Sequence, residues 1–173
     1  MTGLPKRDEA LAALAAQQGG IGLLTGDEGH VSHLMYAPVH YEDTDFSGFV
    51  YHANYLKFAE RGRSNFLRLC GIEHKDLLDL EPQLAFVVSH MAIDFLAPGR
   101  IGDVLLVETL FTQIRGARLQ AEQMISRDGV RLWHARLDAA IVDLDGRPRR
   151  FPKSHADILQ PLTGVSVLDA ENA

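Results

Sequence analysis

The chain has 173 residues, of which 46% are hydrophobic and 23% are charged, as is typical of a globular protein with a single domain. Its formal net charge of −6 at pH 7 argues against a nucleic-acid partner, because phosphate backbones are bound by concentrated Lys and Arg side chains. The single cysteine, Cys70, excludes an intrachain disulfide, and we find neither a secretory signal nor an apolar run long enough for a transmembrane segment. We therefore expect a cytoplasmic protein.

The N-terminal part of the chain is predicted to form an arm outside the core. Residues 6–18 have the spacing of a short helix, which Gly19 and Gly20 would end. The stretch from there to about residue 30 is rich in Gly and acidic residues and is typical of a tether. The predicted organisation is an arm (residues 1–30), a core domain (residues 31–155) and a C-terminal tail (residues 156–173).

The core is predicted to begin with a strand over residues 33–41, followed by a polar loop over residues 42–48. The one long helix is predicted over residues 52–69, with Gly71 placed to end it. Its apolar residues recur at spacings of three and four, which places them on one face. They are Tyr55, Phe58, Ala59, Gly62, Phe66 and Leu69.

Strands are predicted for most of the remaining core. They cover residues 84–97, 103–114, 117–127 and 130–143, and turn signals separate them at Pro98-Gly99, Arg115-Gly116 and Asp128-Gly129. One long helix packed against a curved antiparallel sheet satisfies this order, so the expected fold class is α+β. Several strands are apolar on both faces near their ends, which indicates that another subunit covers part of the sheet.

The chemistry is concentrated in the loop before the long helix. Three acids, Glu42, Asp43 and Asp45, stand in a Gly-containing loop beside a helix N-terminus. The unpaired N–H groups of a helix N-terminus stabilise negative charge, and a carboxylate beside them can attack a carbonyl group or activate a water molecule. Capping of the helix is the alternative interpretation. Asp45 lies seven residues before His52, too far for a simple cap.

This segment resembles the 4-hydroxybenzoyl-CoA thioesterase family, and especially its short-chain acyl-CoA thioesterases associated with the Tol–Pal envelope system. The matching residues include Asp43-Thr44-Asp45, Gly48 and Tyr51-His52-Ala53-Asn54-Tyr55. The likeness covers about residues 33–155. Further matches are Glu60-Arg61, Phe86-Val87-Val88, Asp94-Phe95, Ala97-Pro98, Gly102-Asp103, Arg115-Gly116 and Pro152-Lys153.

The resemblance implies a hotdog fold, in which a curved antiparallel sheet wraps around one long helix, assembled as a homodimer or homotetramer. It implies an acyl-CoA thioesterase in which Asp45 is catalytic, as nucleophile or general base, and the backbone N–H of His52 polarises the thioester carbonyl. The CoA thioester is the substrate, and no metal or other cofactor is implied. The substrate-binding residues implied are Gly48, Tyr51, Ala53, Arg115 and Arg118, and Arg100 is a further candidate phosphate ligand.

Three alternatives stay open at this point. Phe46-Ser47 stands where many relatives have Ala-Gly, so the acyl chain length and the preference for aromatic or aliphatic groups are not predicted. The acyl group could be delivered by CoA or by an acyl carrier protein. The chain could also be a hotdog dehydratase or hydratase, or a non-catalytic dimer that binds acyl thioesters.

Overall fold

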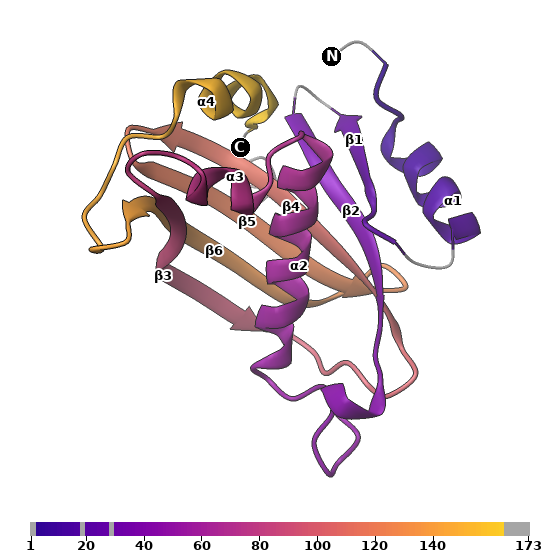
Figure 1. Cartoon of the computed structure of the whole chain (residues 1–173). Helices are drawn as coiled ribbons and strands as arrows, with labels where there is room; N and C mark the ends of the chain where they lie inside the picture. The colour runs from indigo at the N-terminus through magenta and orange to yellow at the C-terminus, as the bar shows by residue number, and fades with distance from the viewer. Residues whose placement is uncertain (1–2, 18–19, 28–29, 165–173) are drawn as a thin grey trace, which may run out of the picture.

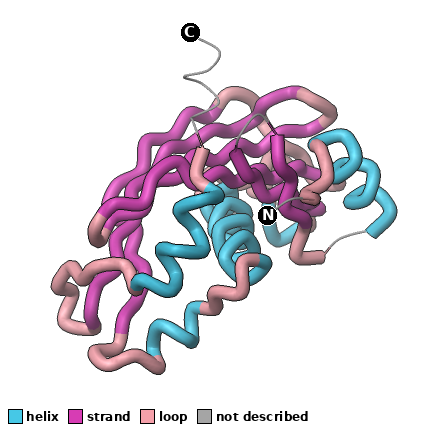
Figure 2. Tube along the Cα trace, turned by 90° about the horizontal axis from the view of Figure 1, so that it is seen from above, coloured by secondary structure: helices cyan, strands magenta, loops and turns pink. Residues whose placement is uncertain are grey.

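The protein is an antiparallel sheet that curves around one long helix, as Figures 1 and 2 show. The computed structural model describes residues 3–17, 20–27 and 30–164. The strands are β1 (Leu23–Asp27), β2 (His30–Pro38), β3 (Leu84–Phe95), β4 (Val104–Arg115), β5 (Arg118–Arg127) and β6 (Val130–Asp143), in the spatial order β1-β2-β4-β5-β6-β3. The helices are α1 (Arg7–Gln17), α2 (Asn54–Leu69), α3 (His74–Leu78) and α4 (Lys153–Leu159), with short 3₁₀ segments at Tyr41–Asp43 and Gln160–Leu162.

Helix α2 packs on the concave face of the sheet, which confirms the predicted helix and its apolar face. Phe58, Ala59 and Phe66 are fully buried. Gly62 permits a very close approach to β4, because a Cβ atom there would lie 2.6 Å from Thr109 Oγ1. The α+β class predicted from the sequence is therefore confirmed.

Strand β6 has the predicted bounds and the predicted inner face. The five residues expected on that face are all buried: Trp133, Ala135, Leu137, Ala139 and Ile141. The preceding hairpin turns at Asp128 and Gly129, which have φ angles of 50° and 78°. Positive φ at both central residues is what the predicted Asp-Gly hairpin requires.

The prediction of a tether before residue 30 is wrong for residues 23–27. They form β1, which pairs with β2 in the register Leu23↔Leu34, and Leu24 and Thr25 are buried. Helix α1 then packs Ala10 and Leu14 against Leu34 on the convex face of the sheet. The predicted helix stop at Gly19 lies outside the described residues.

Two further features differ from the sequence pattern. Strand β3 does not pair with β4, its neighbour in the chain, but with β6, so it forms one edge of the sheet. Helix α4 was not predicted; it runs from the end of the predicted core domain into the predicted C-terminal tail, and it packs Leu159 into the core. In the part of the chain that the structure describes, no helix is long and apolar enough to cross a membrane.

Candidate active site

The loop that holds Asp45 is a tight turn before α2. The backbone N–H of Asp45 donates to the Phe49 carbonyl at 2.9 Å, and the N–H of Gly48 donates to the Asp45 carbonyl at 3.0 Å. Gly48 has a φ angle of 78°, in the left-handed region that favours glycine. These bonds fix the Asp45 backbone within the turn and leave its side chain exposed.

The Asp45 carboxylate is held by Ser47. Asp45 Oδ1 accepts one hydrogen bond from Ser47 Oγ at 2.5 Å and another from the Ser47 backbone N–H at 2.9 Å. Both bonds stabilise the charged form and so lower the pKa of Asp45 below its ordinary value. The bond from the Ser47 hydroxyl group has the larger effect. Asp45 is therefore an exposed, ionised carboxylate at neutral pH.

Asp43, the other aspartate of the motif, has a structural position. Its side chain is buried, and Oδ2 accepts the His40 backbone N–H at 2.9 Å. Its carbonyl oxygen accepts hydrogen bonds from the Tyr51 backbone N–H at 2.9 Å and from Asn54 Nδ2 at 3.0 Å. Asp43 thus connects the loop to the start of α2.

The residues before α2 lie between the Asp45 loop and the end of β3. Tyr51 and His52 are both exposed, with ring centroids 4.4 Å apart, and the His52 ring lies 6.4 Å from that of Phe95. Ala53, the N-cap, already has helical dihedral angles. Among the described residues, the backbone N–H of His52 has no hydrogen-bond acceptor, as is usual at a helix N-terminus.

Of the arginines singled out in the sequence, only Arg100 lies near this loop. Its guanidinium carbon is 4.6 Å from the centre of the Phe49 ring. Arg115 and Arg118 face each other at the far end of the β4–β5 hairpin. The eleven residue-to-residue steps from Val104 to Arg115 extend about 36 Å along β4. One subunit therefore does not bring Arg115 and Arg118 to Asp45.

A small cavity of about 160 Å³, which no sequence pattern indicates, lies between α2, α3 and β3. Its apolar wall includes Leu67, Phe86, Val87, Val88, Phe111 and Leu119. On its polar side, Ser64 Oγ donates to Glu60 Oε1 at 2.5 Å and lies 3.1 Å from His74 Nε2. The spacing of Glu60 and Ser64 is helical, but the contribution of His74 depends on how α3 packs.

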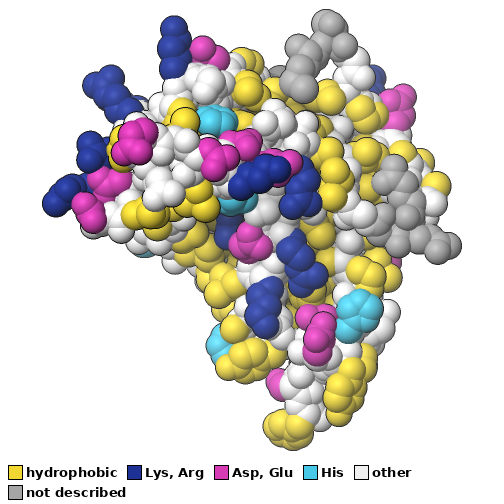
Figure 3. Space-filling view, viewed as in Figure 1, with side chains coloured by type: hydrophobic (Ala, Val, Ile, Leu, Met, Phe, Trp, Pro, Cys, Tyr) yellow, Lys and Arg dark blue, Asp and Glu magenta, His cyan; other side chains and the backbone are white. Residues whose placement is uncertain are grey.

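The exposed side of α2 carries a row of basic side chains next to this cavity. Figure 3 shows Lys and Arg side chains along the helix, and Lys57, Arg61 and Arg68 are exposed. These three residues lie on the side of the helix opposite its buried apolar face. They provide positive charge on the same helix that contributes Glu60 and Ser64 to the cavity.

Comparisons with known proteins give one consistent family. The model of the family described as the thioesterase superfamily matches residues 47–134. The acyl-CoA thioesterase YbgC of Haemophilus influenzae is 44% identical over 116 residues, which are 66% of this chain and 85% of that protein. The solved structure of a probable thioesterase from Bartonella henselae has a TM-score of 0.67 and 43% identity, and the match covers 70% of this chain and 99% of that one. A 4-hydroxybenzoyl CoA thioesterase solved with 4-hydroxybenzoyl CoA shares the fold at a TM-score of 0.68 and 18% identity, over 73% of this chain and 97% of that one.

Proposed function

Because this chain belongs to the thioesterase superfamily, we propose that it hydrolyses an acyl-CoA thioester to a carboxylic acid and CoA, with Asp45 as the catalytic carboxylate. The observation that carries this proposal is the exposed Asp45 carboxylate, which accepts two hydrogen bonds from Ser47 in the loop that leads to α2. Relatives named acyl-CoA thioesterase, at up to 44% identity, support the substrate class.

The chemistry needs a carboxylate, a place for the developing negative charge and a leaving thiolate. Ionised Asp45 either attacks the thioester carbonyl carbon or takes a proton from the water molecule that attacks it. The carbonyl oxygen becomes negative, and the His52 backbone N–H at the helix N-terminus donates to it. The C–S bond then breaks and the CoA sulfur takes up a proton. If water was the attacking group, the carboxylic acid forms in this step. If Asp45 was the attacking group, one water molecule hydrolyses the resulting mixed anhydride to the carboxylic acid and restores the Asp45 carboxylate. No metal or further cofactor takes part.

A complete site is proposed to need two subunits. Strand β3 is an edge strand, and Val87, Val88 and Phe95 are exposed along it. Its Phe95 end lies beside His52, whereas Val87 and Val88, nearer its other end, line the small cavity. If a second copy pairs antiparallel along β3, the Asp45 loop of one subunit comes to the cavity of its partner. The same pairing covers the apolar edge.

This arrangement also provides cations for the CoA phosphates. Lys57, Arg61 and Arg68 lie along the exposed side of α2, and Arg115 and Arg118 lie at the end of the sheet remote from Asp45 of the same subunit. Arginine suits phosphate groups because its planar fork donates two parallel hydrogen bonds. We propose that the acyl group enters the small cavity and that these basic side chains hold the phosphates.

The substrate class is tested by thiol release from acetyl- to palmitoyl-CoA and from 4-hydroxybenzoyl-CoA. Release from one class of acyl group, unchanged by EDTA, is the expected result. The same acyl groups, attached to an acyl carrier protein, are assayed as a second set of substrates. If only the carrier-bound acyl groups are cleaved, CoA is the wrong carrier. If an enoyl thioester is hydrated and no thiol appears, the reaction class is wrong.

The two-subunit site is tested by mixing two inactive variants. Asp45→Asn removes the carboxylate, and Ser64→Trp fills the cavity with a large ring, so each variant alone is expected to be inactive. A mixed dimer has one site that contains both changes and one intact site, so refolding the variants together should restore activity. No recovery, although mixed dimers are shown by mass spectrometry, would mean that each site lies within one subunit.

A further inference from the structure

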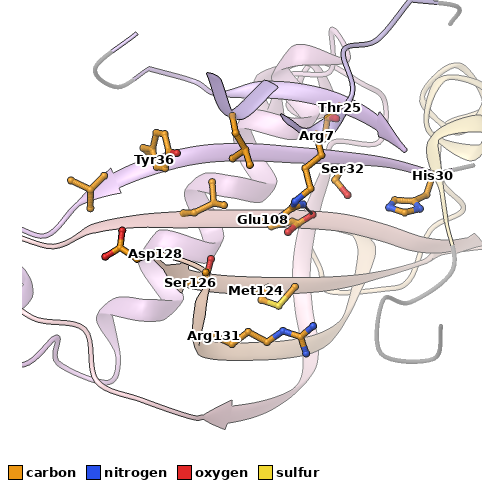
Figure 4. A pocket seen from close by; sticks show the side chains of 14 residues that line it. Arg7, Thr25, His30, Ser32, Tyr36, Glu108, Met124, Ser126, Asp128 and Arg131 are labelled. Atoms are coloured by element: carbon orange, nitrogen blue, oxygen red, sulfur yellow. Dashed lines mark hydrogen bonds and ion pairs between the residues drawn. The ribbon is translucent and has the colours of Figure 1, made fainter. Parts of the chain in front are cut away.

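A second and larger cavity lies on the convex face of the sheet, the face opposite α2. Alternate residues of a strand point to opposite faces, so Leu34 and Leu106 face α1 whereas Met35 and Val107 face α2. The cavity has a volume of about 730 Å³ and lies between α1 and the outer face of β2, β4 and β5 (Figure 4). Helix α1 precedes the part of the chain that the thioesterase family model matches, and nothing in the proposed reaction uses this cavity.

A buried hydroxyl group without a partner faces this cavity. Ser32 is 2% exposed, it lines the cavity, and its Oγ has no hydrogen-bond partner among the described residues. Thr25, its neighbour on β1, differs, because its hydroxyl donates to the Pro5 carbonyl at 2.8 Å. Leaving a buried hydroxyl unpaired costs free energy, so Ser32 marks a position where an occupant of the cavity would be hydrogen-bonded.

The charges of the cavity favour a polar but uncharged occupant. Figure 4 shows Arg7 of α1 and Glu108 of β4 meeting in the middle of the cavity, and Arg7 Nη1 lies 2.5 Å from Glu108 Oε1. Arg131 and Asp128 also line it, so positive and negative side chains balance. A charged head group would meet a side chain of like charge as well as one of opposite charge. An uncharged hydroxyl group can donate and accept hydrogen bonds without that repulsion.

One part of the cavity wall is apolar. Tyr36 and Leu106 pair across β2 and β4 and line the cavity beyond Glu108 as counted from Ser32, and Leu11 of α1 belongs to the same apolar cluster. The four residue-to-residue steps from Ser32 to Tyr36 span about 13 Å along β2. A chain of that length can lie over Leu106 with its polar end at Ser32.

We propose that this cavity binds a single-chain amphiphile with an uncharged hydroxyl head, such as a medium-chain primary alcohol. The hydroxyl group exchanges hydrogen bonds with Ser32 and with the Arg7–Glu108 pair. The alkyl chain lies between α1 and Leu106. This site is independent of the proposed hydrolysis.

NMR signals of methionine methyl groups can report whether a ligand binds in this cavity or elsewhere in the protein. Met124 lines it, whereas Met35 is buried on the α2 side and Met91 packs on the inner core. The full chain is labelled with ¹³C at the methionine methyl groups, the signals are assigned by Met→Leu substitutions, and 1-decanol is added. The Met124 signal should shift in a saturable way while the signals of Met35 and Met91 stay in place.

Variants and probes of different charge complete the test. Ser32→Ala should weaken decanol binding about tenfold or more and should not lower the stability of the free protein, because the hydroxyl it removes is unpaired. Ser126→Ala, in the same cavity away from the proposed head-group position, should bind like the wild type. Decanoate and decylammonium should each bind at least tenfold more weakly than decanol. The proposal is wrong if Met124 does not respond, if Ser32→Ala binds decanol normally, or if either charged probe binds as well.

Discussion

Protonation of His33 should make the protein markedly less stable in mild acid. His33 is fully buried on β2, and its Nε2 lies 2.7 Å from the Ile21 carbonyl oxygen, so the neutral ring donates through Nε2. Its Nδ1 has no hydrogen-bond partner among the described residues, and a second proton there would find no acceptor. Burial lowers the pKa of His33 from 6.5 to about 4, against a smaller opposing effect of the Ile21 hydrogen bond.

The size of the effect follows from this difference in pKa. Between pH 6.5 and pH 4 the unfolded chain binds a proton at His33 that the folded protein does not bind, so the free energy of unfolding falls as the pH falls. The slope is about 1.4 kcal/mol per pH unit, which gives a total loss of about 3 kcal/mol. Above pH 6.5 the ring is neutral in both states, and its contribution no longer changes.

Urea unfolding of the wild type and of His33→Gln at pH 7.5, 6, 5 and 4 measures this contribution. Glutamine can donate a hydrogen bond but does not titrate, and the other titrating groups are common to both proteins. The wild type should therefore lose about 3 kcal/mol more than the variant between pH 7.5 and pH 4. If the two curves run parallel over this range, His33 is not held neutral by burial and the reasoning is wrong.

Two other substitutions test the packing of α2 and the environment of the catalytic loop. Gly62→Ala should lower the free energy of unfolding in urea by about 1–3 kcal/mol, because the new methyl group would lie 2.6 Å from Thr109 Oγ1. Gly26→Ala is the matched control, because its new methyl group would have its nearest contact at 3.4 Å. Equal stability of the two variants would contradict the packing argument. Ser47→Ala should raise the pKa of Asp45, measured by ¹³C NMR of the carboxylate, and should move the acid limb of kcat/KM to higher pH, because the hydrogen bond from Ser47 Oγ lowers that pKa. An unchanged titration of Asp45 would show that Ser47 does not stabilise its charged form.

The sequence predicted those elements whose own pattern determines them. The spacing of Phe58, Gly62 and Phe66 predicted α2, and the alternation after Asp128-Gly129 predicted β6. Strand β1 was missed because it is short and lies among glycines and acidic residues, and its burial depends on pairing with β2. The pairing of β3 with β6 joins distant parts of the chain and has no local signal.

In the candidate site, too, the sequence predicted the local features and missed those that depend on how distant segments pack. The motif predicted the loop of Asp45 and its place before α2, and the expected roles of Asp45 and His52 stay predictions. The separation of Arg115 and Arg118 from that loop depends on the direction of β4 in the folded sheet. The polar group of Glu60, Ser64 and His74 depends on how α3 packs against α2, which no spacing in the sequence specifies.

The most direct test of the proposed function is the steady-state rate of thiol release by the wild type, Asp45→Asn and Asp145→Asn on the best acyl-CoA of the panel. Asp145 is an exposed aspartate in the β6 turn, with a surface ion pair to Arg147, and serves as the matched control. We expect Asp145→Asn to retain the wild-type rate and Asp45→Asn to lose about 10²–10⁴-fold in kcat/KM, with unchanged unfolding transitions. An Asp45→Asn variant that keeps near-wild-type activity would contradict the central claim that the Asp45 carboxylate performs the hydrolysis.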